Sequence, residues 1–181
     1  MRLELALAVT TVAVTLSGAA RAADAPSLGG DWTLNRELSQ DLAAKIVAVT
    51  GGDQAKSDPD LGRARDELLE LARRGDTLEI ELGKDQVQMA YANDDVRIFY
   101  PGREHTRERA GLGKIRALSR WEGGSLVIEQ ALAGGAKSVE TYSLIDDGRR
   151  MAVMLKLEAK RLREPLTARI VYDRDETPPM P

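Results

Sequence analysis

Residues 77–100 read TLEIELGKDQVQMAYANDDVRIFY, and this stretch decides the fold. Apolar and polar side chains alternate over 77–82, 86–91 and 95–100, a period of two that is typical of strands burying one face. Gly83-Lys84-Asp85 and Asn93-Asp94, which favour tight turns, separate the three segments. The stretch therefore predicts three consecutive antiparallel strands. The side chains expected to face the core are Leu78, Ile80, Leu82, Val87, Met89, Tyr91, Val96, Ile98 and Tyr100.

The alternation continues beyond this stretch, with short turns rich in Gly, Asp and Pro between its segments. Ten strands are predicted, at 30–34, 77–82, 86–91, 95–100, 103–109, 114–121, 125–132, 137–145, 150–159 and 165–173. The connections after residue 77 are too short for a crossover, so neighbouring strands must be antiparallel. A long meander with one apolar face per strand buries that face best by closing on itself. We therefore expect a mainly β protein, an antiparallel up-and-down β-barrel of about ten strands.

The segment between the first and second strands, about 36–75, has a helical pattern instead. Leu38, Leu42 and Ile46 recur every four residues and predict a first helix that ends at Gly51-Gly52. A second helix is predicted to begin at Asp58-Pro59, a capping residue followed by the residue best suited to the first helical position. Its apolar face would be formed by Leu61, Ala64, Leu68 and Ala72, and Gly75 would end it. We expect this two-helix insert to lie across one open end of the barrel.

The first 22 residues have the pattern of a cleaved signal peptide. Met1-Arg2 supplies a basic start, Leu5 to Leu16 an apolar segment, and Ala20-Arg21-Ala22 the small residues of a cleavage site. The apolar segment falls short of the roughly 20 residues that span a bilayer, although an N-terminal anchor or a buried helix are the alternatives. We expect a protein secreted across the inner membrane, periplasmic in a Gram-negative bacterium, without stable membrane insertion. A single domain is expected over 23–175, followed by a flexible tail over 176–181.

Composition argues against several classes of function. The chain has 26 Lys+Arg against 29 Asp+Glu and lacks a concentrated basic tract, which argues against nucleic acid as a partner. It has no Cys and one His, which excludes disulfides, thiolate metal sites, thiol catalysis and multi-histidine centres. Cationic neighbours should lower the pKa of that residue, His105. With no catalytic motif in the sequence, we expect no enzyme, no catalytic residue, no metal site and no cofactor.

The start and the end of the predicted barrel resemble those of known proteins. Gly30-x-Trp32 is similar to the G-x-W signature of calycins, the lipocalins and fatty-acid-binding proteins, and the order of one strand, two helices and nine strands is similar to the latter. The chain also resembles an uncharacterised group of exported bacterial lipocalin-like proteins, through this start, the Asp147-Gly148 turn and the ending Val171-Tyr172-Asp173. The resemblance implies that Trp32 plugs one end of the barrel.

The last strand is similar to the closing strand of fatty-acid-binding proteins, where an Arg and a Tyr hold the ligand carboxylate. In that family the Arg lies two residues before the Tyr, but here that position is Ile170. Arg169 lies three residues before Tyr172 and should therefore point to the other face. The resemblance thus carries over Tyr172 as a ligand-binding residue but not the Arg of the clamp.

Residues 103–109, REHTRER, break the rule of one apolar face per strand. As a strand, the segment would place Arg103, His105, Arg107 and Arg109 on one face and its acidic residues on the other. The basic face could look into the barrel and bind an anionic head group, since Arg makes bidentate contacts with anions. Alternatively, the segment is a solvated strand or a frayed gap in the barrel wall. Its sequence leaves both interpretations open.

Two classes of function remain. In the first, the barrel binds a small hydrophobic or amphiphilic ligand, with an anionic head near Arg103, Arg107 and Tyr172 and a tail against apolar residues that include Met89 and Ile98. In the second, the barrel is filled by its own side chains and serves as a structural or protein-interaction module of the cell envelope. The presence of an enclosed cavity is the observation that discriminates between them.

Overall fold

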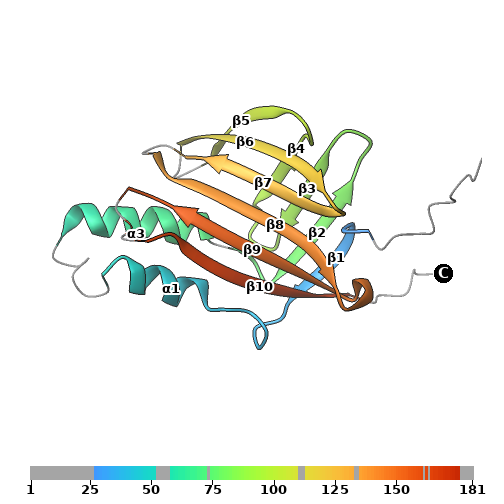
Figure 1. The fold of residues 1–181 in the computed structure, drawn as a ribbon, viewed down its shortest axis with the longest axis horizontal. Coiled ribbons are helices and arrows are strands. Elements are labelled where there is room, and N and C mark those ends of the chain that lie inside the picture. The colour runs from blue at the N-terminus through green and yellow to red at the C-terminus, as the bar shows by residue number, and fades with distance from the viewer. Residues whose placement is uncertain are drawn as a thin grey trace, which may run out of the picture.

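In the part of the chain that it describes, a computed structural model contains ten antiparallel strands, two α-helices and the short 3-10 helix η2 (Asp146–Gly148) (Figure 1). The structure describes residues 27–51, 58–72, 74–109, 113–132, 135–160, 162 and 164–175. In chain order the elements are β1 (Gly30–Leu34), α1 (Leu42–Val49), α3 (Pro59–Ala72), β2 (Thr77–Leu82), β3 (Val87–Tyr91), β4 (Val96–Phe99), β5 (Glu104–Arg109), β6 (Gly113–Glu122), β7 (Ser125–Ala131), β8 (Lys137–Ile145), β9 (Arg150–Glu158) and β10 (Leu166–Arg174). The predicted order of one strand, two helices and nine strands is confirmed.

The strands form one sheet in the order β4-β3-β2-β1-β10-β9-β8-β7-β6-β5. Every pair is antiparallel, and β1 joins the two halves by pairing with both β2 and β10. The two edge strands, β4 and β5, do not pair with each other, so the barrel is interrupted between them. An isolated bridge joins Pro101, just after β4, to Ser119 on β6. The predicted up-and-down barrel is therefore confirmed as a nearly closed one, and the basic strand β5 forms one side of the interruption.

Alternation places one face of each strand inside the barrel, as the sequence predicts for most strands. Ile80 on β2, Met89 on β3 and Ile128 on β7 are buried in a common core. The prediction is wrong for β4, where Arg97 and Phe99 face inward and Val96 is exposed. Arg97 lies opposite the buried Met89 in the register of β3 and β4, which puts the two side chains on the same face. Ile98 accordingly lies on the other face and is only half-buried.

The helices begin where capping residues permit. Asp41 caps α1 by accepting a hydrogen bond from Ala44 N at 2.9 Å, so Leu38 precedes the helix and is largely exposed, contrary to prediction. The second helix, α3, begins at Pro59 as predicted. The buried Leu42, Ile46 and Leu68 join the barrel core, while the side chains of Leu61, Ala64 and Ala72 lie outside the described part of the chain. Both helices lie at the same end of the barrel (Figure 1).

Trp32 on β1 pairs in register with Arg174, the last residue of β10, and Figure 1 shows that β10 finishes at the end of the barrel away from the helices. The side chain of Trp32 is fully buried and its Nε1 donates to Leu28 O at 3.0 Å. The guanidinium of Arg174 lies over the indole, 4.2 Å from the ring centroid. It donates three hydrogen bonds to backbone carbonyls, those of Gly148, Gly29 and Ser27. This burial is what the G-x-W resemblance implies for a residue that plugs the barrel.

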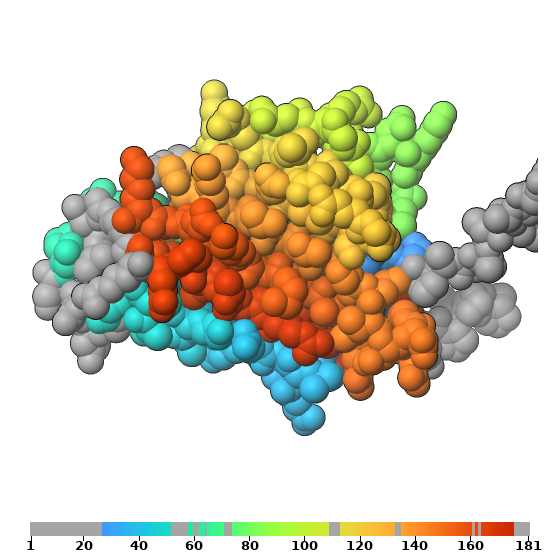
Figure 2. Space-filling model, viewed as in Figure 1, coloured from blue at the N-terminus to red at the C-terminus, as the bar shows by residue number. Residues whose placement is uncertain are grey.

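The segment between β1 and α1, residues 35–41, runs along the edge of β10 (Figure 2). Asn35 N donates to Val171 O and Gln40 N donates to Arg169 O, both at 2.9 Å. Val171 N in turn donates to Ser39 Oγ at 2.9 Å. These bonds continue the pairing of β10 beyond the end of β1 and fix the segment, hereafter loop 35–41, in place.

The predicted signal peptide, residues 1–22, and the tail, residues 176–181, lie outside the described residues. In the part of the chain that the structure describes, neither helix combines the length and the apolar character needed to cross a bilayer.

Candidate functional site

A cluster of polar side chains lies inside the barrel, where alternation alone predicts an apolar core. Arg74 precedes β2, Arg97 belongs to β4, and Glu140 belongs to β8. Only 5% of the Arg74 side chain is exposed, and 1% of the side chains of Arg97 and Glu140. Ion pairs this deep in a protein persist only when charge and hydrogen bonding are both satisfied.

Glu140 is the centre of the cluster. Arg74 Nη2 lies 2.9 Å from Glu140 Oε1, and the hydroxyl of Tyr142 donates to Glu140 Oε2. Arg74 Nη1 donates to the hydroxyls of Tyr91 and Tyr142, at 3.1 and 3.2 Å. On the other side of the carboxylate, Gln130 Nε2 donates to Glu140 Oε1 at 3.3 Å. Both oxygens of the carboxylate are therefore engaged by the chain itself.

The charges of this cluster stabilise one another. Burial by itself raises the pKa of Glu140, but Arg74, Arg97 and the hydrogen bond from Tyr142 outweigh it and lower that pKa to about 2. Burial opposes the charge of Arg74 as well, yet Glu140 raises the pKa of Arg74 well above its ordinary value. Arg97 donates to Asp95 through Nε and Nη2, at 2.8 and 2.6 Å, and lies over the Tyr91 ring. Near neutral pH, Arg74, Arg97 and Glu140 are therefore all ionised.

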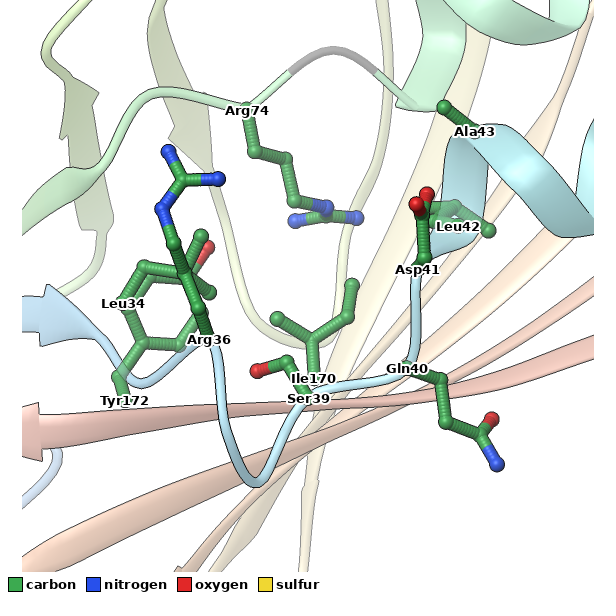
Figure 3. Close-up of a pocket in the computed structure, with 10 residues that line it drawn as sticks. All are labelled: Leu34, Arg36, Ser39, Gln40, Asp41, Leu42, Ala43, Arg74, Ile170 and Tyr172. Atoms are coloured by element: carbon green, nitrogen blue, oxygen red, sulfur yellow. The ribbon is translucent and has the colours of Figure 1, made fainter.

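A cavity of about 350 Å³ lies beside this cluster, between loop 35–41, Arg74 and β10 (Figure 3). Its apolar lining includes Leu34, Leu42 and Ile170, and Figure 3 shows Ile170 between Tyr172 and Asp41. The complete lining is Leu34, Arg36, Ser39, Gln40, Asp41, Leu42, Ala43, Arg74, Ile170 and Tyr172. Its size lies at the lower end of the range typical of small-molecule sites.

Apart from Arg74 Nη2, which lies in the ion pair with Glu140, two buried polar groups on the cavity wall have no hydrogen-bond partner among the described residues. They are Nε of Arg74 and the hydroxyl of Tyr172, and Tyr172 is fully buried. Burial raises the pKa of Tyr172 above its ordinary value, so the phenol keeps its proton and remains a donor. A buried donor without an acceptor costs stability, and such atoms call for an explanation. Acceptor atoms of a bound molecule are the partners that these donors lack.

The five residues predicted to bind ligand do not form one site. Tyr172 lines the cavity, and Met89 is fully buried in the core. Arg103 is exposed, with its guanidinium over the Tyr100 ring, and lies away from Tyr172 along the surface that carries Trp121. Ile98 is on the other face of β4 from Arg97, so its predicted position inside the barrel is wrong.

The basic strand β5 turns part of its basic face inward. Arg107 Nη2 donates to Gln130 Oε1 at 3.0 Å, which links β5 through Gln130 to Glu140. His105 packs edge-on against the rings of Phe99 and Tyr100. Burial lowers the pKa of His105, and Arg107 lowers it further, which confirms the predicted direction. The sequence left open whether this basic face looks into the barrel or into solvent. The structure shows both, because His105 and Arg107 are half-buried and Arg103 is exposed.

Arg74, Arg97 and Glu140 are the residues that the sequence reasoning missed. Glu140 alternates with Val139 and Thr141 on a strand where either face is plausible. Its register partners, Ile128 on β7 and Leu155 on β9, are both core residues. Placing these strands in register would therefore have pointed to Glu140 as an inward-facing acid.

Comparison with known proteins places this barrel among solved structures. No family model and no curated protein sequence matches the chain. A Schistosoma mansoni fatty acid binding protein in complex with arachidonic acid matches with a TM-score of 0.57 and 16% identity, covering 84% of this chain and 98% of that one. The apo lipid binding protein 8 of Caenorhabditis elegans matches with a TM-score of 0.55 and 14% identity, over 81% and 94%.

A third solved structure, the REP1-NXSQ fatty acid transporter, matches with a TM-score of 0.53 and 19% identity, over 81% of this chain and 95% of that one. The chain has the fatty-acid-binding-protein-like β-barrel fold. The resemblance that starts at Gly30-x-Trp32 is therefore confirmed at the level of fold. At such low sequence identities, the functional roles of residues in those proteins cannot be transferred to this chain.

Proposed function

We propose that the protein binds a small hydrophobic or amphiphilic molecule in the cavity beneath loop 35–41. The observation that carries the proposal is the combination, on one cavity wall, of two unpartnered buried donors with an apolar lining. A concave apolar site with a few convergent polar groups is the usual form of a small-molecule site. The fold supports the proposal by analogy, because the similar solved structures include a fatty acid transporter and a fatty acid binding protein with a bound fatty acid.

The ligand would lie with its apolar part against Leu34, Leu42 and Ile170 and its polar atom toward Arg74 and Tyr172. It would gain access past Ala43, an exposed residue of α1 that also lines the cavity. Loop 35–41 is bonded to β10, so this wall is formed before the ligand arrives. A site built in advance lowers the ordering cost of binding.

Access past Ala43 gives a direct test with a matched control. In the Ala43→Trp variant the added indole should obstruct the cavity and weaken binding of the apolar fluorophore N-phenylnaphthylamine at least about tenfold. Ala48→Trp adds the same indole at another exposed position of α1, outside the cavity lining, and should bind like the wild type. Equal binding by all three proteins would place the fluorophore elsewhere, and no binding by any would favour the structural or interaction module.

We also propose that the protein acts after export, as a soluble protein of the periplasm. The signal-peptide pattern ending at Ala22 supports this. Expression of the full chain in a Gram-negative bacterium, followed by fractionation and intact-mass measurement, tests it. Export predicts a periplasmic protein that begins at Ala23, whereas an intact Met1 in the cytoplasmic fraction would contradict it.

A further inference from the structure

The carboxylate of Glu140 occupies the place in this barrel where a ligand anion would find its charge partners. It contacts Nη2 of Arg74 and accepts hydrogen bonds from Tyr142 and Gln130. Nη1 of Arg74 is engaged as well, with the hydroxyls of Tyr91 and Tyr142. Both Nη atoms of the Arg74 guanidinium are therefore engaged within the chain, and Nε is its remaining donor.

The other cations near the cavity are also paired. Arg97 is held by Asp95, through Nε and Nη2. Arg36, at the solvent side of the cavity, lies 2.6 Å from Asp76. The two side chains that β10 contributes to the lining are Ile170 and Tyr172, neither of which is a cation. An additional carboxylate here would have to be desolvated close to Glu140, without a cation of its own among these groups.

What the cavity does offer is two donors without acceptors. Nε of Arg74 and the hydroxyl of Tyr172 both belong to its wall, and Figure 3 shows Arg74 above Ile170 and Tyr172 to the left of it. An uncharged oxygen, such as that of an alcohol, an aldehyde or an ester, satisfies these donors without adding a charge.

We propose that the cavity is selective for an uncharged amphiphile over its carboxylate counterpart, and that Glu140 sets this selectivity by occupying Arg74. This inference rests on the proposed function, because it specifies the class of ligand for the same cavity. It replaces the anionic head group that the sequence suggested with a neutral oxygen head. Tyr172 keeps the ligand-contact role that the sequence predicted for it.

The test compares decanol with decanoate, which share a chain length and differ in the charge of the head. Each displaces N-phenylnaphthylamine from the full mature protein at pH 8, where the free carboxyl group is ionised. For the wild type, decanol should displace the fluorophore at a concentration at least about tenfold lower than decanoate. Tighter binding of decanoate would overturn the inference while leaving the proposed function intact. Failure of both compounds and of the fluorophore to bind would overturn the two together.

Variants sharpen the assignment to Glu140. In Glu140→Gln the side chain keeps its shape and loses its charge, so Arg74 becomes available and the preference for decanol should fall at least about tenfold. An unchanged preference in a folded Glu140→Gln protein would overturn the role of Glu140. If circular dichroism shows that the Glu140→Gln variant does not fold, the inference is tested by the Tyr172→Phe variant, together with the ratio of decanol to decanoate affinity in the wild type. Tyr172→Phe should weaken binding of decanol several-fold and leave binding of N-phenylnaphthylamine unchanged, and equal decanol affinity would contradict the proposed contact.

Discussion

Two arginines of this barrel, Arg174 and Arg74, serve opposite purposes. Each carries its guanidinium near an aromatic ring, that of Trp32 for Arg174 and that of Tyr91 for Arg74. Arg174 donates from all three of its nitrogens to backbone carbonyls. Arg74 leaves Nε without a partner among the described residues, on the wall of a cavity. The first arrangement is complete within the described residues, and the second leaves one donor for the proposed ligand.

The same contrast holds along β10, which contributes one residue to the surroundings of Trp32 and another to the cavity beside Arg74. Arg174 closes the Trp32 region, and Tyr172, two residues earlier, presents an unpartnered hydroxyl to the cavity. Satisfied polar groups hold a structure together, whereas unsatisfied buried ones mark a place where stability has been given up. The Trp32 region is therefore interpreted as structural and the Arg74 region as the binding site.

The largest expected effect is at the structural region. Trp32→Ala removes a fully buried indole and should lower the free energy of unfolding by about 3–5 kcal/mol, measured by urea denaturation. Trp121→Ala is the matched control, because that indole is 45% exposed and its loss should cost far less. Similar losses for the two variants would show that Trp32 does not close the barrel.

A smaller effect is expected at Glu140, and it depends on pH. A pKa of 4.5 in the unfolded chain and about 2 in the folded protein corresponds to about 3 kcal/mol of stability. Because the folded-state pKa is the lower one, this contribution is fully present above pH 4.5 and is lost as the pH falls toward 2. The difference in unfolding free energy between the wild type and Glu140→Gln should therefore shrink over this range. A difference independent of pH would contradict an ionised, buried Glu140.

The smallest effect is expected at Tyr172. Tyr172→Phe removes a hydroxyl that has no hydrogen-bond partner among the described residues, so stability should stay the same or rise by up to about 1 kcal/mol. Tyr142→Phe, the matched control, removes a hydroxyl that donates to Glu140, and it should cost about 1.5–3 kcal/mol. Thermal unfolding of the two variants without ligand measures this contrast. A marked loss at Tyr172 would mean that its hydroxyl already has a stabilising contact.

The strands could be predicted because their limits depend on local chemistry. Asp94 and Asp147 adopt positive φ angles in the turns where the sequence placed them, and Gly124 does the same between β6 and β7. Asp58-Pro59 marked the start of α3 for the same reason. The prediction that Leu38 belongs to the first helix was wrong, because the apolar spacing extends one turn before Asp41, the residue that caps α1.

The interior charges could not be predicted by alternation. That rule assigns a charged residue to the solvent face, so it put Ile98 inside and Arg97 outside. The true orientation depends on Asp95 and Tyr91, which bind Arg97, and on Glu140. Arg74 and Glu140 come from distant parts of the chain, and only the closed barrel brings them together. The sequence could single out Tyr172, which lines the cavity, because this residue belongs to a motif.

The most direct test of the binding site is the Nε–H resonance of Arg74 in ¹⁵N-edited NMR spectra, followed as decanol is added. Arg174 is the internal reference, because its Nε already donates to Gly148 O at 2.8 Å. Substitution of Arg74 by Lys assigns the Arg74 signal. The account predicts a saturable shift of the Arg74 resonance and an unmoved Arg174 resonance. Binding of decanol that leaves Arg74 Nε–H unchanged, or that shifts Arg174 instead, would contradict it.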